Sequence, residues 1–153
     1  MSQKIILLVE DQPDDEELTI RALGKNKTLN KIVVVRDGAE ALEYLFGTGS
    51  HVGCSERDMP HLILLDLKLP KVDGLEVLKR LRTDPRTLFL PIVIMTASQE
   101  EQDLIQSYQL GANSYIRKPI DLVDFTRSVQ QLGLYWLALH DPVPAELATF
   151  SGR

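Results

Sequence analysis

The chain has 153 residues, of which 44% are hydrophobic and 25% are charged, as expected for a soluble globular protein with one packed core. The formal net charge of -5 disfavours nucleic acid as the main partner, because phosphate binding needs a basic surface. A single cysteine excludes an intrachain disulfide, and we find neither a signal-peptide pattern nor an apolar run long enough to span a membrane. We therefore expect a cytoplasmic protein without nucleic-acid or membrane partners.

The first part of the chain alternates between short apolar runs and helical patterns. Residues 5–9 form a partly β-branched run that predicts a strand, and Pro13 follows at a position suited to opening a helix. Apolar residues at helical spacing continue this helix to about Gly24. A second β-branched run predicts a strand at residues 32–35, and a turn and a short helix at residues 39–46 follow it.

The middle of the chain contains a long loop and the most apolar strand. Residues 47–60 are rich in Gly, Ser and charge, and this loop is either an insertion with a role or tolerated slack. Residues 62–65 are entirely apolar, which is typical of a strand buried on both faces in the middle of a parallel sheet. Asp73 and Glu76 then form a capping-box pattern that predicts a helix ending at Asp84.

The last part of the sheet is predicted from two further apolar runs. Residues 91–96 form a fourth buried strand, and Ser98 and Glu101 form a second capping-box pattern that opens a helix. Gly111 is the expected left-handed stop of this helix. Residues 114–116 then form a short fifth strand.

A last helix, capped by Asp121, completes five strand–helix pairs. This alternation predicts an α/β fold, a doubly wound parallel sheet of five strands with helices on both faces.

Reactive side chains follow four of the predicted strands. Glu10 and Asp11 end the first strand, Asp66 ends the third, Thr96 ends the fourth and Lys118 lies just past the fifth. Each alone has an ordinary explanation, as a helix cap, a turn residue, a strand residue or a solvated lysine. The carboxyl ends of parallel strands, however, share one edge of the sheet, where ligands bind in open α/β folds. We therefore expect these groups to converge.

Carboxylates that converge in this way need a proton or a cation between them. Two carboxylates about 4 Å apart repel by roughly 4 kcal/mol at an effective dielectric constant near 20. Oxygen ligands without His or Cys suit a hard cation such as Mg²⁺. With Thr96 and Lys118 as donors, the site has the groups for phosphoryl transfer to a carboxylate nucleophile.

These residues lie in a series of motifs that resembles the receiver domain of two-component response regulators. The resemblance covers residues 4 to 135. The motifs, in order, are Val9-Glu10-Asp11, Leu65-Asp66-Leu67-Lys68-Leu69-Pro70, Asp73-Gly74, Met95-Thr96-Ala97, Gly111-Ala112 and Tyr115-Ile116-Arg117-Lys118-Pro119. The resemblance implies a flavodoxin-like fold of five strands and five helices with strand order 2-1-3-4-5.

The resemblance also implies roles for the residues at the sheet edge. Asp66 would accept a phosphoryl group from the phosphohistidine of a sensor histidine kinase. Asp11, Asp66 and the backbone carbonyl of Lys68 would ligate Mg²⁺ directly, with Glu10 acting through water. The chain would then be a signalling protein that slowly dephosphorylates itself, and not an enzyme with a separate substrate. The Glu10-Asp11 pair departs from the commoner Asp-Asp, and Lys68 stands where Asn or Met is common.

The remaining motif residues would form the switch. Thr96 would move to bond the phosphoryl group, Tyr115 would turn inward behind it, and Lys118 would pair with a phosphoryl oxygen. The Lys118-Pro119 peptide bond is expected to be cis, which only proline makes inexpensive.

More narrowly, the chain is similar to the single-domain response regulators that pair with cyanobacterial phytochromes. The long loop before Pro60, the segment around Asp66 and the C-terminal extension carry this resemblance. It implies a phytochrome-type, light-regulated histidine kinase as the partner.

The C-terminal extension predicts an interface. We divide the chain into a receiver domain at residues 1–135 and an extension at 136–153, which is too short for a separate output domain. The segment where the two meet is continuously apolar and includes Leu134, Tyr135, Trp136 and Leu137. It either folds back onto its own domain or, as we favour, packs against a second copy. In the family, the fourth helix, fifth strand and fifth helix often form the dimer face that phosphorylation changes.

Two other classes of function fit parts of this pattern. A haloacid-dehalogenase-type phosphatase also uses an Asp nucleophile, Mg²⁺, Thr and Lys, but it needs an acid two residues after the nucleophile, where this chain has Lys68. A receiver that serves only as a scaffold would not need every reactive position to be filled.

Overall fold

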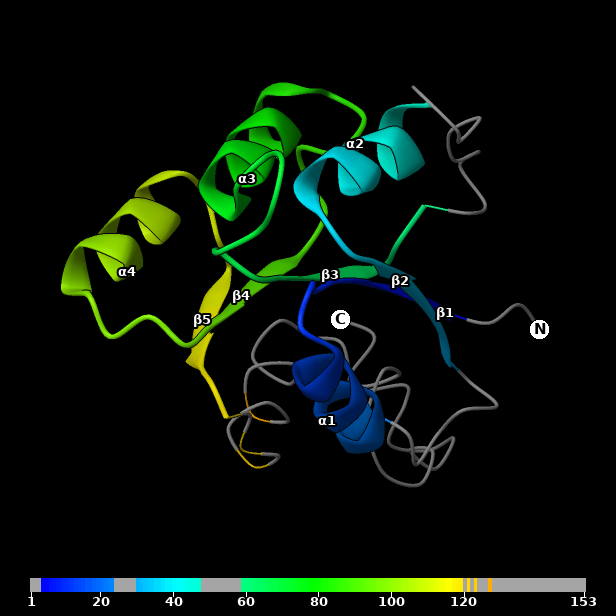
Figure 1. Cartoon of the computed structure of the whole chain (residues 1–153). Helices are drawn as coiled ribbons and strands as arrows, with labels where there is room; N and C mark the ends of the chain where they lie inside the picture. Colours follow the sequence, from blue (N-terminus) through cyan, green and yellow to red (C-terminus); the bar gives the residue numbers. More distant parts are fainter. Residues whose placement is uncertain are drawn as a thin grey trace, which may run out of the picture.

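The computed structural model describes residues 4–23, 30–47, 59–119, 121, 123 and 127. Within these residues, a sheet of five strands is covered by helices on both faces (Figure 1). The strand order is β2-β1-β3-β4-β5, and every pair is parallel. The elements are β1 (Lys4–Val9), α1 (Pro13–Leu23), β2 (Asn30–Val35), α2 (Gly38–Phe46), β3 (Leu62–Leu65), α3 (Gly74–Thr83), β4 (Ile92–Thr96), α4 (Glu101–Gln109) and β5 (Ser114–Arg117).

The central strands are apolar along their whole length because both of their faces are covered. All four residues of β3 are completely buried. Successive side chains on a strand point to opposite faces. Ile63 and Leu65 therefore join a core with α2 and α3, whereas Leu62 and Leu64 join a second core with Leu23 of α1. Figure 1 shows this layering, with α1 on one side of the sheet and α2, α3 and α4 on the other.

The predicted doubly wound parallel sheet with order 2-1-3-4-5 is confirmed. The fifth predicted helix lies almost wholly outside the described residues, as do residues 48–58 of the long loop and the C-terminal extension. Gly111 has the expected left-handed backbone, with φ of 104°, and the Lys118-Pro119 peptide bond is cis as predicted. No helix of the described part is long and apolar enough to cross a membrane.

The predicted capping box at Ser98 is wrong. Helix α4 begins at Glu101, after Glu100, whose side chain makes no capping hydrogen bond. The Ser98 hydroxyl instead accepts a hydrogen bond from the Glu100 backbone N–H at 3.1 Å and donates one to Asp103 at 2.6 Å. Ser98 therefore holds an extended β4–α4 loop, three residues before the first residue of the helix.

The predicted capping box at Asp73 is half correct. Asp73 does cap α3, but its carboxylate accepts from the backbone N–H of Leu75 at 2.8 Å. The carboxylate of Glu76 pairs with Arg80, one turn further along the helix, at 3.0 Å. Glu76 thus supports the exposed face of α3.

Candidate functional site

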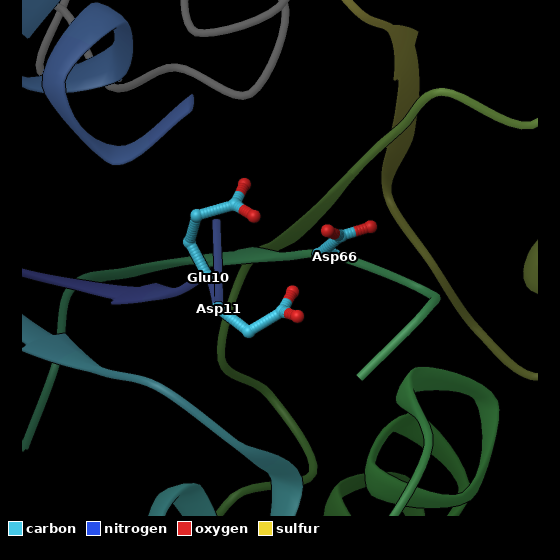
Figure 2. Close-up of side chains that lie close together, drawn as sticks. All are labelled: Glu10, Asp11 and Asp66. Atoms are coloured by element: carbon cyan, nitrogen blue, oxygen red, sulfur yellow. The ribbon is translucent and has the colours of Figure 1, made fainter. Parts of the chain in front are cut away.

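Three carboxylates meet at the carboxyl edge of the sheet, after β1 and β3. Glu10 is completely buried, Asp66 is 4% exposed and Asp11 is half-buried. One oxygen from each lies within 4.8 Å of the others. Figure 2 shows these side chains close together where the two adjacent strands end. The parallel pairing of β1 with β3, with Val9 opposite Leu65, places the residues that follow side by side.

Lys118 supplies the positive charge of this cluster. Its ammonium donates hydrogen bonds to Glu10 Oε1 at 2.6 Å, Asp15 Oδ2 at 2.9 Å and Asp66 Oδ2 at 3.0 Å. The side chain is only 8% exposed, so these ion pairs are shielded from solvent. Lys118 follows β5 by one residue, and its backbone N–H donates to the carbonyl of Thr96 at 2.8 Å. This contact holds the chain after β5 against the end of β4.

Burial and the neighbouring charges shift the pKa values of Glu10 and Lys118. Burial, together with the charge of Asp66, raises the pKa of Glu10 to about 7, although Lys118 lowers it in part. Burial alone lowers the pKa of Lys118, but its hydrogen bonds to the three carboxylates outweigh this and raise the pKa overall. At neutral pH the lysine is therefore charged.

The donor set fits a hard divalent cation. All three clustered side chains offer carboxylate oxygens, the ligands that Mg²⁺ and Mn²⁺ accept. Asp11 Oδ1 is a buried atom without a hydrogen-bond partner among the described residues. A buried unpaired carboxylate oxygen is costly, so its presence beside two further acids points to a bound cation.

Thr96 and Tyr115 lie on the neighbouring strands, in positions that agree with their predicted placement. Thr96 ends β4 and is completely buried, and its hydroxyl oxygen accepts from the Ser98 backbone N–H at 3.1 Å. Tyr115 packs against the core, and its hydroxyl oxygen is buried without a hydrogen-bond partner among the described residues. Burial raises the pKa of Tyr115, which stays neutral.

The Lys68 side chain extends toward α4. Its ammonium lies 3.6 Å from Asp103 Oδ2, and the side chain is 72% exposed, so the ion pair is weak on its own. The backbone N–H of Lys68 donates to Asp66 Oδ1 at 3.3 Å, which orients that carboxylate. Asp103 is 7% exposed and also accepts the Ser98 hydroxyl. Lys68 therefore connects the loop that follows Asp66 to the start of α4.

Sequence reasoning missed Asp15. This residue lies in the first turn of α1, where an acid is expected simply to favour the helix dipole. The sequence does place Asp15 only four residues after Asp11, and so close to the predicted end of the first strand. The contact with Lys118, 103 residues away, could not be read from that spacing.

The predicted interface residues cannot be placed. Leu134, Tyr135, Trp136 and Leu137 lie outside the described residues.

Comparisons with known sequences give the same family. The model of the response regulator receiver domain matches residues 6–130. The response regulator Rcp1 of Synechocystis sp. is 38% identical over 134 residues, which are 88% of this chain and 89% of Rcp1.

Solved structures of phytochrome response regulators share the fold. AtBRR, a bacteriophytochrome response regulator, is 48% identical, with a TM-score of 0.75 over 89% of this chain and 96% of its own. The phosphorylated cyanobacterial phytochrome response regulator RcpA is 38% identical, with a TM-score of 0.75 over 92% and 98% of the two chains. The Mn²⁺-bound form of Rcp1 is 37% identical, with a TM-score of 0.72 over 92% and 99%. With its sheet order, its acid cluster and its family model in agreement, this chain belongs to the response regulator receiver domain family and is related to the phytochrome response regulators.

Proposed function

We propose that the protein is a phosphorylation switch that accepts a phosphoryl group on Asp66. The observation that carries this proposal is the ion pair between Asp66 and Lys118 inside the acid cluster. Asp66 Oδ2 accepts from the Lys118 ammonium at 3.0 Å, within an acid cluster suited to a divalent cation. A carboxylate held in this way is positioned as a nucleophile, and the lysine is positioned to neutralise an arriving phosphate.

The transfer step needs no chemistry beyond a displacement at phosphorus. A carboxylate oxygen of Asp66 forms a bond to phosphorus, while the bond from phosphorus to the donor breaks and its electron pair leaves with the donor group. For a sensor histidine kinase the donor is a phosphohistidine nitrogen, and for acetyl phosphate it is an acyl oxygen. Lys118 then pairs with a phosphoryl oxygen, which offsets the charge that the new group brings.

Mg²⁺ is the cation that we propose for the acid cluster. Asp11, Asp66 and the backbone carbonyl of Lys68 would hold it directly, and Glu10 would act through water. A bound divalent cation would neutralise the phosphoryl oxygens as they approach the carboxylates. The relative Rcp1 has a Mn²⁺-bound structure, which supports a divalent cation in this protein.

The output is proposed to run through Thr96 and Tyr115. The Thr96 hydroxyl now accepts from Ser98, and it would instead donate to a phosphoryl oxygen. Tyr115 has a buried hydroxyl without a hydrogen-bond partner among the described residues. Its side chain would turn further inward when Thr96 and the β4–α4 loop move toward the phosphoryl group. These two movements would change the face formed by α4, β5 and the segment that follows.

The proposed partner is a phytochrome-type sensor histidine kinase in the cytoplasm. The similarity to AtBRR and RcpA, both described as phytochrome response regulators, supports this choice. In this role the protein has no separate substrate, and it loses its phosphoryl group slowly to water.

The alternatives fit the site less well. A haloacid-dehalogenase-type phosphatase needs a general acid two residues after the nucleophile, and Lys68 stands there with its ammonium directed to Asp103. A scaffold role needs no bound cation, whereas Asp11 Oδ1 is buried without a hydrogen-bond partner among the described residues and lies beside two further acids.

Acetyl phosphate with Mg²⁺ tests the proposed function. We expect the wild type to gain one labile phosphoryl group by intact mass, and Asp66→Asn to gain none, because an amide is not a nucleophile at phosphorus. Asp14→Asn is the matched control, since Asp14 is an exposed acid near the same edge and should not affect labelling. Absence of labelling on the wild type, both with acetyl phosphate and with a phosphorylated histidine kinase, would overturn the proposal.

We further propose that residues 1–135 form the receiver domain and that residues 136–153 extend a homodimer interface. Trp136→Ala is expected to weaken self-association at least about tenfold, because truncating a buried aromatic anchor costs about 2 kcal/mol or more. Sedimentation at micromolar concentration measures this. Phe89→Ala is the control, since Phe89 is 88% exposed in the connection before β4. Equal association of both variants and the wild type would count against an interface at Trp136.

A further inference from the structure

The Lys118 ammonium is held by carboxylates from three separate parts of the chain. Glu10 follows β1, Asp66 follows β3, and Asp15 belongs to the first turn of α1. An ammonium has three N–H donors, and here each one meets a different carboxylate. The lysine side chain is 8% exposed and Asp15 is 33% exposed, so the α1 contact closes the solvent side of the cluster.

Asp15 differs from the other two partners in what else it can bind. Glu10 and Asp66 belong to the group of oxygens that lie within 4.8 Å of one another and fit a cation, and Asp15 does not. A cation in the acid cluster would compete with Lys118 for Glu10 and Asp66. A phosphoryl group on Asp66 would turn the carboxylate that Lys118 contacts into a neutral acyl group and would move the negative charge to the phosphoryl oxygens. The contact between Lys118 and Asp15 is the one that neither cation binding nor phosphorylation would disturb.

We propose that Asp15 is a positioning residue for Lys118. It anchors the ammonium to α1 while the cation and the phosphoryl group occupy the other two partners, and so keeps the ammonium aimed at a phosphoryl oxygen. This inference rests on the proposed function. It gives α1 a role in phosphoryl binding, although α1 contributes no residue to the acid cluster.

The first turn of α1 supplies the control for a general effect of charge. Asp14, Asp15 and Glu16 all lie there and all favour the helix dipole. Glu16 pairs with Arg36 at 3.0 Å, whereas Asp14 is exposed. Asp14→Asn therefore removes the same charge from the same helix turn without touching Lys118.

The test separates cation binding from phosphoryl binding. Mg²⁺ affinity is measured by calorimetry, and beryllofluoride, a phosphoryl analogue, is then titrated at saturating Mg²⁺. We expect Asp15→Asn to weaken beryllofluoride binding about tenfold relative to Asp14→Asn, because the amide that replaces the carboxylate carries no charge to pair with Lys118. Mg²⁺ affinity should agree within about twofold between these two variants, because the charge change is the same. Asp15→Glu keeps the carboxylate and should recover at least part of the beryllofluoride affinity.

Each outcome decides between the two proposals. Equal beryllofluoride affinities in Asp15→Asn and Asp14→Asn, with tight binding to the wild type, would overturn the role of Asp15 and leave the phosphorylation switch intact. A parallel loss of Mg²⁺ and beryllofluoride affinity in Asp15→Asn alone would show a structural effect and also overturn it. No beryllofluoride binding and no phosphorylation of the wild type would instead overturn the proposed function.

Discussion

Replacing Lys118 with methionine is expected to lower the free energy of unfolding by about 3–5 kcal/mol in buffer without divalent cations. The substitution keeps an unbranched side chain, one atom shorter, and removes its charge. Glu10 and Asp66, which are buried, then lose the one cationic partner that they have among the described residues, and their negative charges face each other without compensation. Urea denaturation followed by circular dichroism measures the loss. Lys79→Met is the control, since Lys79 is exposed on α3.

Divalent cations should reverse much of this loss. Mg²⁺ binds the carboxylates that methionine leaves unpaired, so it should raise the unfolding midpoint of Lys118→Met more than that of the wild type. The same variant should also lose phosphoryl transfer from acetyl phosphate, by about a hundredfold or more, since it lacks the charge that pairs with the phosphoryl oxygen. A variant as stable as Lys79→Met without cations would show that the ion pairs do not hold the site together.

The pKa of Glu10 sets the sign of the pH dependence. In the folded protein this pKa is about 7, above the ordinary value of 4.5, so the folded state keeps a proton that the unfolded state has lost. The contribution of Glu10 therefore falls as the pH rises from 4.5 through about 7. Removing Lys118 takes away a charge that lowers this pKa, so the loss in Lys118→Met should be smaller at pH 5, where Glu10 keeps its proton, than at pH 8.

Gly74→Ala is expected to destabilise the protein by about 3 kcal/mol or more. A Cβ at this position would overlap the carbonyl oxygen of Asp66 and lie 2.6 Å from Leu67 Cα. Both are backbone atoms, and the Gly74 N–H also donates to the Leu67 carbonyl at 2.8 Å, so the loop cannot move away without losing that hydrogen bond. Helix propensity alone favours alanine over glycine by roughly 1 kcal/mol and so predicts that Gly74→Ala stabilises the protein. Destabilisation would therefore show that the clash outweighs helix propensity.

The unfolding midpoint in urea and labelling by acetyl phosphate together measure the effect of Gly74→Ala. Labelling of the folded fraction by acetyl phosphate should also slow, because the new methyl group would displace the backbone of Asp66, the residue that is labelled. Lys79→Ala on the exposed face of α3 is the control, with an expected change within about 0.5 kcal/mol. Equal midpoints for Gly74→Ala and Lys79→Ala would show that the α3 start has room beside Asp66.

The location of the site follows from residue order. The apolar runs before Glu10, Asp66 and Thr96 are typical of buried parallel strands, and parallel strands present their carboxyl ends at one edge. For this reason the sheet and the meeting of the three acids with Lys118 could be expected before any coordinates. Predictions of helix caps from residue spacing were less reliable, because a side chain at the right spacing can form hydrogen bonds with other partners. Ser98 has the spacing of a helix cap, but it bonds Asp103 and the loop instead.

What the sequence determined by itself is therefore the fold class, the order of the strands by family resemblance and the acids at the sheet edge. Only the tertiary structure decided which carboxylates hold Lys118, where the Lys68 ammonium lies and why Gly74 has no side chain. The physical reason is range. Strand burial and helix periodicity depend on neighbours in the chain. Asp15 and Lys118 lie 103 residues apart, and only the folded chain brings the Lys118 ammonium within 2.9 Å of the Asp15 carboxylate.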